Sequence, residues 1–250
     1  MANLFNYYEI KENKMLSARL SKILEKIPSC DILADIGTDH GYIPLEAIKA
    51  NKCKHAIASD VSKGSLEKAI NQVNLSKLNS VIDTRLGSGL KILNEDEADV
   101  LVIAGMGGIL IKEILKDDYD KKFKVKNPTM IFQPVQFPES LRKYLIENNF
   151  EIIDEDLVED DKIIYNIIIS KKGLGEKTDS WNDMDFEFGK INIEKKHPLL
   201  LKLLDRKINE QKKIIHKLKD AEGENISSRL EEVETLLYKF KELRKCCFQK

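Results

Sequence analysis

The sequence predicts an α/β fold, in which a parallel sheet covered by helices on both faces is followed by a hairpin of two long helices. Two observations support this prediction. Up to residue 172, short apolar runs alternate with segments of helical periodicity, as in strands joined by crossover helices. Beyond residue 185, apolar residues recur every three or four positions over two long stretches. We therefore expect a sheet domain at 1–172 and a linker with a helical hairpin at 173–250.

The first element is expected to be an amphipathic helix over 16–27, where Leu20, Ile23 and Leu24 recur at helical spacing before Pro28 ends the pattern. Short apolar runs predict strands at 32–36, 56–60, 81–86, 100–104 and 129–132. Helices are expected between them, at 44–50, 63–75, 109–115 and 138–148. Two final strands, at 152–158 and 162–170, are expected to form a hairpin around the acidic turn 159–161.

The C-terminal part is predicted to be an antiparallel, coiled-coil-like hairpin. Gly223 lies in the polar segment 220–225, which would form its turn. The residues at core-type spacing in the two helices are Leu201, Leu204, Ile208, Gln211, Ile215 and Leu218, then Ile226, Leu230, Val233, Leu237 and Phe240. A polar stretch at 171–185 is expected to link this hairpin to the sheet.

The charge of the chain is unevenly distributed. The net charge is -1, which by itself does not indicate a nucleic-acid-binding protein. The segment from Lys195 to Lys219, however, contains nine basic residues and only two acidic ones. This segment falls in the first helix of the predicted hairpin, so one helical face is expected to be basic, either as an ordinary solvated face or as a contact for RNA.

Other classes of protein are disfavoured by what the chain lacks. Its four cysteines have no zinc-ligand spacing, so no metal is expected. No apolar run approaches the roughly 20 residues that a membrane span requires, and the polar segment 1–15 lacks the apolar core of a signal peptide. We therefore expect a cytoplasmic protein without membrane contact, and we separately expect it to be a monomer.

The loop from Asp35 to Tyr42 is the most informative segment. It joins a predicted strand to a predicted helix and contains Gly37, which is typical of a nucleotide-cofactor site. Dinucleotide-binding loops carry glycine where this chain has Asp39, because the backbone must approach a pyrophosphate there. A carboxylate would repel phosphate, so the loop suits a cationic ligand that carries adenosine without phosphate. S-adenosylmethionine fits that description.

Further candidate residues follow the other predicted strands. Asp60 ends the second strand, where an acidic side chain accepts hydrogen bonds from ribose hydroxyls. Gly87, Ser88 and Gly89 follow the third strand and allow close approach of a flat ligand. The glycine-rich segment 104–108 follows the fourth strand, which is expected to lie beside the first, so this loop should face the reactive end of the cofactor.

Three residues keep two interpretations each. Asp60 is either a ribose ligand or a surface carboxylate at a strand end. His40 is equally consistent with a structural role and a role in the site. Tyr42 would either stack on a base or pack within the fold.

Taken together, these segments resemble one family, the bacterial tRNA adenine-22 N1-methyltransferases. The resemblance rests on the order and spacing of Leu16-Ser17-Ala18-Arg19-Leu20, the Asp35 loop, Gly87 to Leu90, Ile103 to Gly108 and Gln133-Pro134, and it spans essentially the whole chain. It implies a Rossmann-like class I methyltransferase sheet of seven strands, the last one antiparallel. It also implies methyl transfer from S-adenosylmethionine to N1 of adenosine 22 in tRNA.

The same resemblance implies roles for individual residues. Asp39 and Tyr42 are the candidate catalytic residues, with Asp39 stabilising the cationic product or accepting a proton from N6. The residues expected at the cofactor are Asp35, Gly37, Thr38, Asp39, His40, Gly41, Asp60, Val61, Gly87, Ser88, Gly89, Ala104, Gly105 and Met106. Those expected at the substrate are Arg19, Gly107, Gly108, Gln133 and Pro134. The basic helical hairpin is expected to hold tRNA.

One departure from the family concerns Ser88, which stands where relatives often have an acidic residue between the glycines. Three alternatives also stay open. The absence of a complete Gly-x-Gly-x-x-Gly motif disfavours an NAD-linked oxidoreductase. A methyltransferase acting on another RNA or a small molecule is disfavoured less strongly. Intact glycine loops argue against a non-catalytic docking module.

Overall fold

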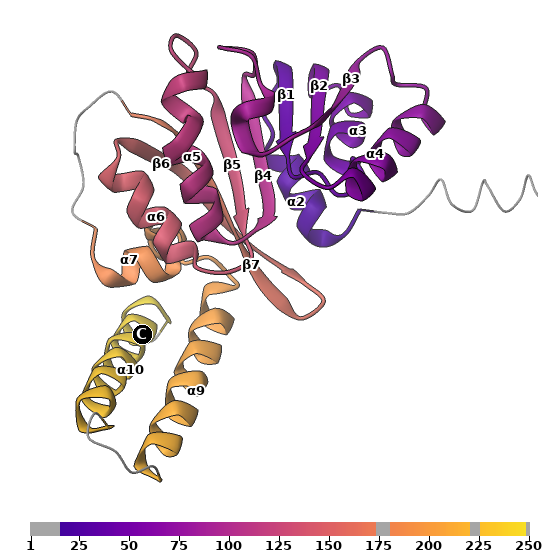
Figure 1. The fold of residues 1–250 in the computed structure, drawn as a ribbon. Helices are drawn as coiled ribbons and strands as arrows, with labels where there is room; N and C mark the ends of the chain where they lie inside the picture. Colours follow the sequence, from indigo (N-terminus) through magenta and orange to yellow (C-terminus); the bar gives the residue numbers. More distant parts are fainter. Residues whose placement is uncertain (1–15, 174–180, 221–225, 249–250) are drawn as a thin grey trace, which may run out of the picture.

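A seven-stranded mixed sheet forms the centre of the protein (Figure 1), with strand order β3-β2-β1-β4-β5-β7-β6. The computed structural model describes residues 16–173, 181–220 and 226–248. The strands are β1 (Cys30–Ile36), β2 (Cys53–Asp60), β3 (Ile82–Leu86), β4 (Val100–Met106), β5 (Thr129–Pro134), β6 (Phe150–Asp160) and β7 (Ile163–Lys172). β7 pairs antiparallel with β5 and β6, whereas β1 to β5 pair in parallel.

Helices cover both faces of this sheet, as the sequence predicts (Figure 1). They are α2 (Ala18–Lys26), α3 (Tyr42–Lys49), α4 (Lys63–Leu75), α5 (Gly108–Lys122), α6 (Pro138–Glu147), α7 (Asp183–Phe188), α8 (Lys190–Glu194), α9 (Leu200–Lys219) and α10 (Ile226–Phe248), with a short 3₁₀ turn, η1, at Gly89–Ile92.

Alternate residues of the central strands point to opposite faces, which divides the core into two layers. In β4, Val100 and Val102 pack with residues of α2, α3 and α4, whereas Leu101 and Ile103 pack with residues of α5 and α6. All four side chains are almost fully buried. This burial on both faces explains why the sequence shows these strands as continuous apolar runs.

The order of the strands reverses between β1 and β4. From β1 the chain moves outward through β2 to β3, and it then returns to place β4 on the other side of β1. The loops that follow β1 and β4 therefore diverge to opposite faces of the sheet. Such a switch point leaves a crevice at the carboxyl ends of the strands, where ligands bind in open α/β sheets.

The main differences from the predicted elements lie in their lengths and in the linker. α5 extends to Lys122, seven residues beyond the predicted end at 115. β6 begins before the predicted residue 152, and β7 ends after the predicted residue 170. The predicted linker contains the start of α7, where Asn182 and Asp185 form a reciprocal capping box. α8 follows directly, so two short helices occupy part of a region in which the sequence pattern predicts none.

α9 and α10 pack against each other below the sheet (Figure 1). Leu204, Ile208 and Phe240 are buried between them, in a cluster that also includes Leu157 of β6 and Phe188 of α7. The hairpin is thus attached to the sheet through an apolar contact. Residues 221–225 of the predicted turn and the segment 1–15 lie outside the described residues.

Two kinds of feature are absent from the described residues. None of their helices is long and apolar enough to cross a membrane. Within the same ranges, no group of three or more His, Cys, Asp or Glu side chains is arranged to hold a metal ion.

Candidate active site

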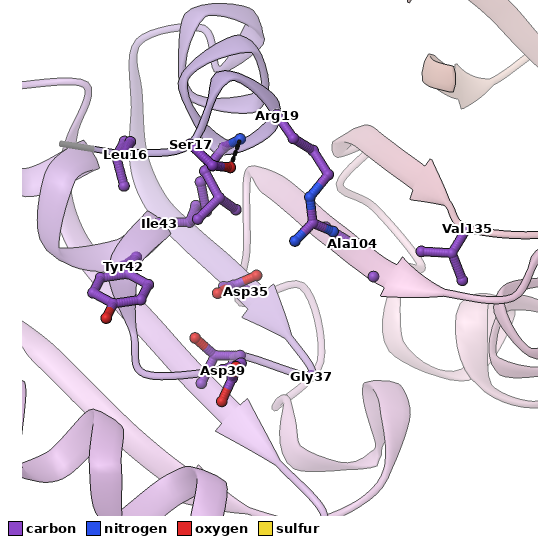
Figure 2. A pocket seen from close by; sticks show the side chains of 13 residues that line it. Leu16, Ser17, Arg19, Asp35, Gly37, Asp39, Tyr42, Ile43, Ala104 and Val135 are labelled. Carbon is purple, nitrogen blue, oxygen red and sulfur yellow. Dashed lines mark hydrogen bonds between the residues drawn. The ribbon is translucent and has the colours of Figure 1, made fainter. Parts of the chain in front are cut away.

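A cavity of about 450 Å³ opens at the switch point between β1 and β4 (Figure 2). Its walls come from the start of α2, from the loop between β1 and α3, and from the ends of β4 and β5. The lining residues are Leu16, Ser17, Arg19, Leu20, Asp35, Gly37, Thr38, Asp39, Tyr42, Ile43, Ala104, Gly105 and Val135. The loop predicted from the sequence as the cofactor site is therefore the largest contributor to this cavity.

The loop after β1 is held in place by hydrogen bonds from its backbone. The amides of Gly37 and Thr38 both donate to the carbonyl oxygen of Ser59, at 2.8 and 2.7 Å. Gly37 has a φ of +81°, and a Cβ there would collide with the terminal methyl of Met106. Glycine adopts this φ without strain, whereas any other residue would be strained and would also require the flexible end of Met106 to move.

Asp35 is the buried acidic group of the cavity. Its residue is 5% exposed, and Figure 2 shows the carboxyl facing the space between Ser17 and Asp39. The pKa of Asp35 is raised to about 7, mainly because the carboxyl is buried and also because the carboxylate of Asp60 lies nearby. No ion pair of the described residues involves Asp35. A buried carboxyl without a cation is suited to receive one from a ligand.

Asp39 and the two rings after it lie at the outer side of the cavity. The Asp39 side chain is 71% exposed, and its Oδ1 lies 2.8 Å from Nδ1 of His40. The imidazole of His40 stacks on the ring of Tyr42, with centroids 5.3 Å apart and planes inclined by 8°. Tyr42 lines the cavity and His40 does not. His40 therefore contacts both Tyr42 and Asp39 without lining the cavity itself.

Arg19 crosses the opposite side of the cavity, from α2 toward the end of β4 (Figure 2). Its Nη1 donates to Oε1 of Gln133 at 2.6 Å, and the amide of Gly105 donates to the same oxygen at 3.2 Å. The guanidinium also lies 5.3 Å from the ring centroid of Tyr165. Gln133 is fully buried and thus acts as a fixed bridge between Arg19 and the β4–α5 loop.

The remaining predicted site residues lie at the same edge of the sheet, outside the lining of the cavity. Asp60 ends β2, where its Oδ1 accepts a hydrogen bond of 2.6 Å from the amide of Ser62. The other residues in this position are His40, Gly41, Val61, Gly87, Ser88, Gly89, Met106, Gly107, Gly108, Gln133 and Pro134.

Five lining residues were missed by the sequence prediction: Leu16, Ser17, Leu20, Ile43 and Val135. Ser17 also caps α2, because its hydroxyl accepts a hydrogen bond from the amide of Leu20. The first three residues belong to a helix start that precedes β1 in the chain, so only tertiary packing brings them to the cavity. Ile43 and Val135 directly follow predicted site residues, and that adjacency was the available signal.

Comparison with known proteins gives consistent matches. The model of a family described as tRNA (adenine(22)-N(1))-methyltransferase matches residues 33–242. A Bacillus subtilis protein of that same description is 38% identical over 158 residues, which are 63% of this chain and 66% of the relative. The match thus spans slightly less than two thirds of that relative.

Solved structures extend the similarity over nearly the whole chain. A crystal structure of the tRNA methyltransferase TrmK from Bacillus subtilis superposes with a TM-score of 0.83 at 31% identity, covering 92% of this chain and 99% of that one. A Streptococcus pneumoniae structure in complex with S-adenosyl-L-methionine has a TM-score of 0.77 at 27% identity, covering 92% of this chain and all of that one. The chain belongs to the tRNA (adenine(22)-N(1))-methyltransferase family.

Proposed function

We propose that this protein transfers the methyl group of S-adenosylmethionine to N1 of adenosine 22 in tRNA. The observation that carries the proposal is the cavity at the β1–β4 switch point of a chain that belongs to this family. Its acidic side chains, Asp35 and Asp39, exclude a phosphate-bearing cofactor and suit an ammonium group. The related structure with bound S-adenosyl-L-methionine supports the choice of cofactor.

The residues around the cavity fit this cofactor. Asp35 provides a buried carboxyl for the ammonium, and Asp60 at the end of β2 provides an acceptor for ribose hydroxyls. The loop containing Gly87, Ser88 and Gly89 follows the neighbouring strand β3 and is positioned to flank adenine. Since Ser88 is not acidic, a hydroxyl or a backbone carbonyl would make any contact to the adenine amino group.

On the substrate side, the protein has to orient a base. S-adenosylmethionine supplies a methyl group on a sulfonium, and N1 of adenine has a free lone pair, so alignment of the two accounts for most of the rate. Arg19 and Gly105, joined through Gln133, form the wall of the cavity toward the β4–α5 loop. We assign proton acceptance from N6 to the exposed carboxylate of Asp39, and base stacking to Tyr42.

The test is transfer of a labelled methyl group from S-adenosylmethionine to unmodified tRNA, with the product nucleosides separated. We expect labelled 1-methyladenosine, and we expect Asp39→Asn to lower kcat while tRNA binding stays unchanged. Transfer to another nucleoside, or to small molecules alone, would contradict the proposal. Cofactor binding without any transfer to tRNA would agree with the fold and the cofactor but would show that tRNA is not the substrate.

The basic face of α9 is the proposed contact for tRNA, in a cytoplasmic enzyme that acts as a monomer. Lys202 and Arg206 pair with Glu159 at the end of β6, which is the cavity edge of the sheet. Lys213 and Lys217 continue the same helical stripe, are exposed, and form no ion pair among the described residues. The stripe therefore extends away from the cavity edge and ends in two lysines without an acidic partner among the described residues.

The monomeric state is tested by light scattering. A measured mass equal to the chain mass of 28.7 kDa would agree with a monomer, and twice that mass would not.

Replacing both Lys213 and Lys217 by Gln is expected to weaken tRNA binding and to lower the slope of log affinity against log salt by about 1.5–2, because each lysine neutralises one phosphate. Affinity for the cofactor should not change. The control is Lys77→Gln with Lys116→Gln, which removes the same charge from α5 and from a position two residues beyond the end of α4. Equal salt slopes for the two double variants would show that the stripe does not contact RNA.

A further inference from the structure

Four large apolar side chains are exposed together beside the cavity: Ile109 and Leu110 at the start of α5, and Val135 and Phe137 between β5 and α6. Leu110 is 53% exposed and Phe137 is 49% exposed. We call these four residues the apolar rim. Isolated exposed apolar residues are ordinary, but a cluster on adjacent loops marks a contact surface.

The two loops that carry the apolar rim are joined through their backbones. The amide of Val135 donates to the carbonyl of Met106 at 2.9 Å, and the amide of Gly108 donates to the carbonyl of Gln136 at 2.7 Å. A Cβ at Gly108 would collide with the carbonyl of Phe137. Glycine at this position therefore permits the close contact, and the rim is a fixed surface.

Phe137 has a strained backbone, with φ +54° and ψ +46° immediately before Pro138. Left-handed conformations are uncommon for an aromatic residue. Asn51, Lys77 and Asn149 also have positive φ values, but each follows the end of a helix, where this conformation is common. Phe137 instead precedes a helix, so that explanation does not apply. Strain of this kind, held by surrounding structure, is concentrated at functional sites.

The apolar rim is continuous with the cavity on the substrate side. Val135 belongs to the lining of the cavity, as do Ala104 and Gly105 of the strand to which its loop is joined. All four rim side chains are uncharged, so these side chains offer no positive charge to a phosphate. It offers an aromatic face and aliphatic edges, and an unpaired base stacks on such a surface independently of its sequence.

We propose that Phe137, framed by the apolar rim, stacks on a nucleobase of the RNA substrate next to the adenosine that enters the cavity. The inference rests on the proposed function and adds a substrate-contacting residue to it. The target N1 lies on the pairing edge of adenine, so the base must be unpaired before it reacts. When the target base leaves its stack, the base next to it loses a stacking neighbour. A stacking surface beside the cavity would replace that neighbour.

The experiment compares Phe137→Asn with Phe137→Trp. Asn tolerates the left-handed backbone and removes the ring, so the variant should keep its melting temperature. We expect its KM for tRNA to rise about tenfold, with unchanged affinity for S-adenosylmethionine. Phe137→Trp should retain the KM of the wild type within about twofold, and its added indole emission should be quenched when tRNA binds.

Leu75→Asn is the matched control, because Leu75 is an exposed apolar residue at the far end of α4. A wild-type KM in Phe137→Asn, or indole emission in Phe137→Trp that does not respond to tRNA, would overturn the inference. Wild-type protein that transfers no methyl group to tRNA would overturn the proposed function instead, so the two failures are distinguishable.

Discussion

Replacing Asp35 by Asn is expected to weaken binding of S-adenosylmethionine by about 100-fold at pH 8, because a buried charge pair between the carboxylate and the ammonium is lost. The pKa of Asp35 is about 7 in the free protein, so a cationic ligand has to displace a proton from part of the population at neutral pH. Wild-type affinity should therefore rise between pH 6 and 8 and then level off. In Asp35→Asn it should not vary over that range.

The same substitution should stabilise the free protein at pH 8. A carboxyl whose pKa is raised on folding holds its proton more tightly in the folded chain, so its favourable contribution is complete below the ordinary pKa of 3.8 and is lost progressively as the pH rises to about 7. Asn carries no such penalty. We expect a melting temperature about 4 °C or more above that of the wild type at pH 8, and a difference that narrows steadily as the pH falls from 7 toward 4.

Calorimetric titration and thermal melts at several pH values would measure both effects. Asp31→Asn is the control, because Asp31 lies at the other end of the same strand with an exposed side chain paired to Lys54. S-adenosylhomocysteine has the same ammonium and should show the same pH dependence. Affinity that is equal in wild type and Asp35→Asn would place the ammonium elsewhere.

The second large effect is expected at Arg142, which is fully buried in α6. Its Nε donates to Oε1 of Glu155 at 2.6 Å, and its Nη2 donates to Asn166 at 2.8 Å. Its Nη1 donates to the carbonyl of Phe186 in α7, and Glu155 accepts from the amide of Ile191 in α8. This one ion pair thus joins α6, β6 and β7 to the two short helices that lead to the hairpin.

Arg142→Met should destabilise the protein by about 3–5 kcal/mol, because it leaves the buried carboxylate of Glu155 without its positively charged partner. Replacing both Arg142 and Glu155 by Met should restore part of that loss, since no buried charge then remains. Lys143→Met is the control, because the neighbouring lysine is 64% exposed and lies 3.9 Å from Glu147. Its change should stay within about 0.5 kcal/mol. Denaturant unfolding measures all three, and equal losses in Arg142→Met and Lys143→Met would contradict the account.

The sheet and the position of the loop between β1 and α3 at the cavity were predictable because both have strong local signals. Strands such as β4 are buried on both faces and read as apolar runs, and Gly37 with Asp39 follows such a run directly. α7 and α8 were not predictable in this way, since they are short and polar contacts hold them together with the apolar packing of Phe188. The hydrophobic pattern has no signal for the capping box of Asn182 or for the contacts with Glu155.

Charged residues illustrate the limit of reading composition alone. Arg142 and Glu155 are charged and fully buried, which no local pattern reveals, because their pairing crosses elements distant in the chain. Conversely, not all basic residues of α9 are available to a ligand, because some are already paired with an acidic side chain. Lys202 and Arg206 are paired with Glu159, so the net field of the stripe depends on the remaining lysines.

The most direct test of the central claim is to locate the modified nucleotide. Unmodified tRNA would be incubated with the protein and S-adenosylmethionine and then copied by reverse transcription, which stops at 1-methyladenosine because its pairing edge is blocked. The account predicts a new stop at position 22, absent when guanosine replaces the adenosine there. A stop at another position, or labelled product that persists without the adenosine at 22, would contradict it.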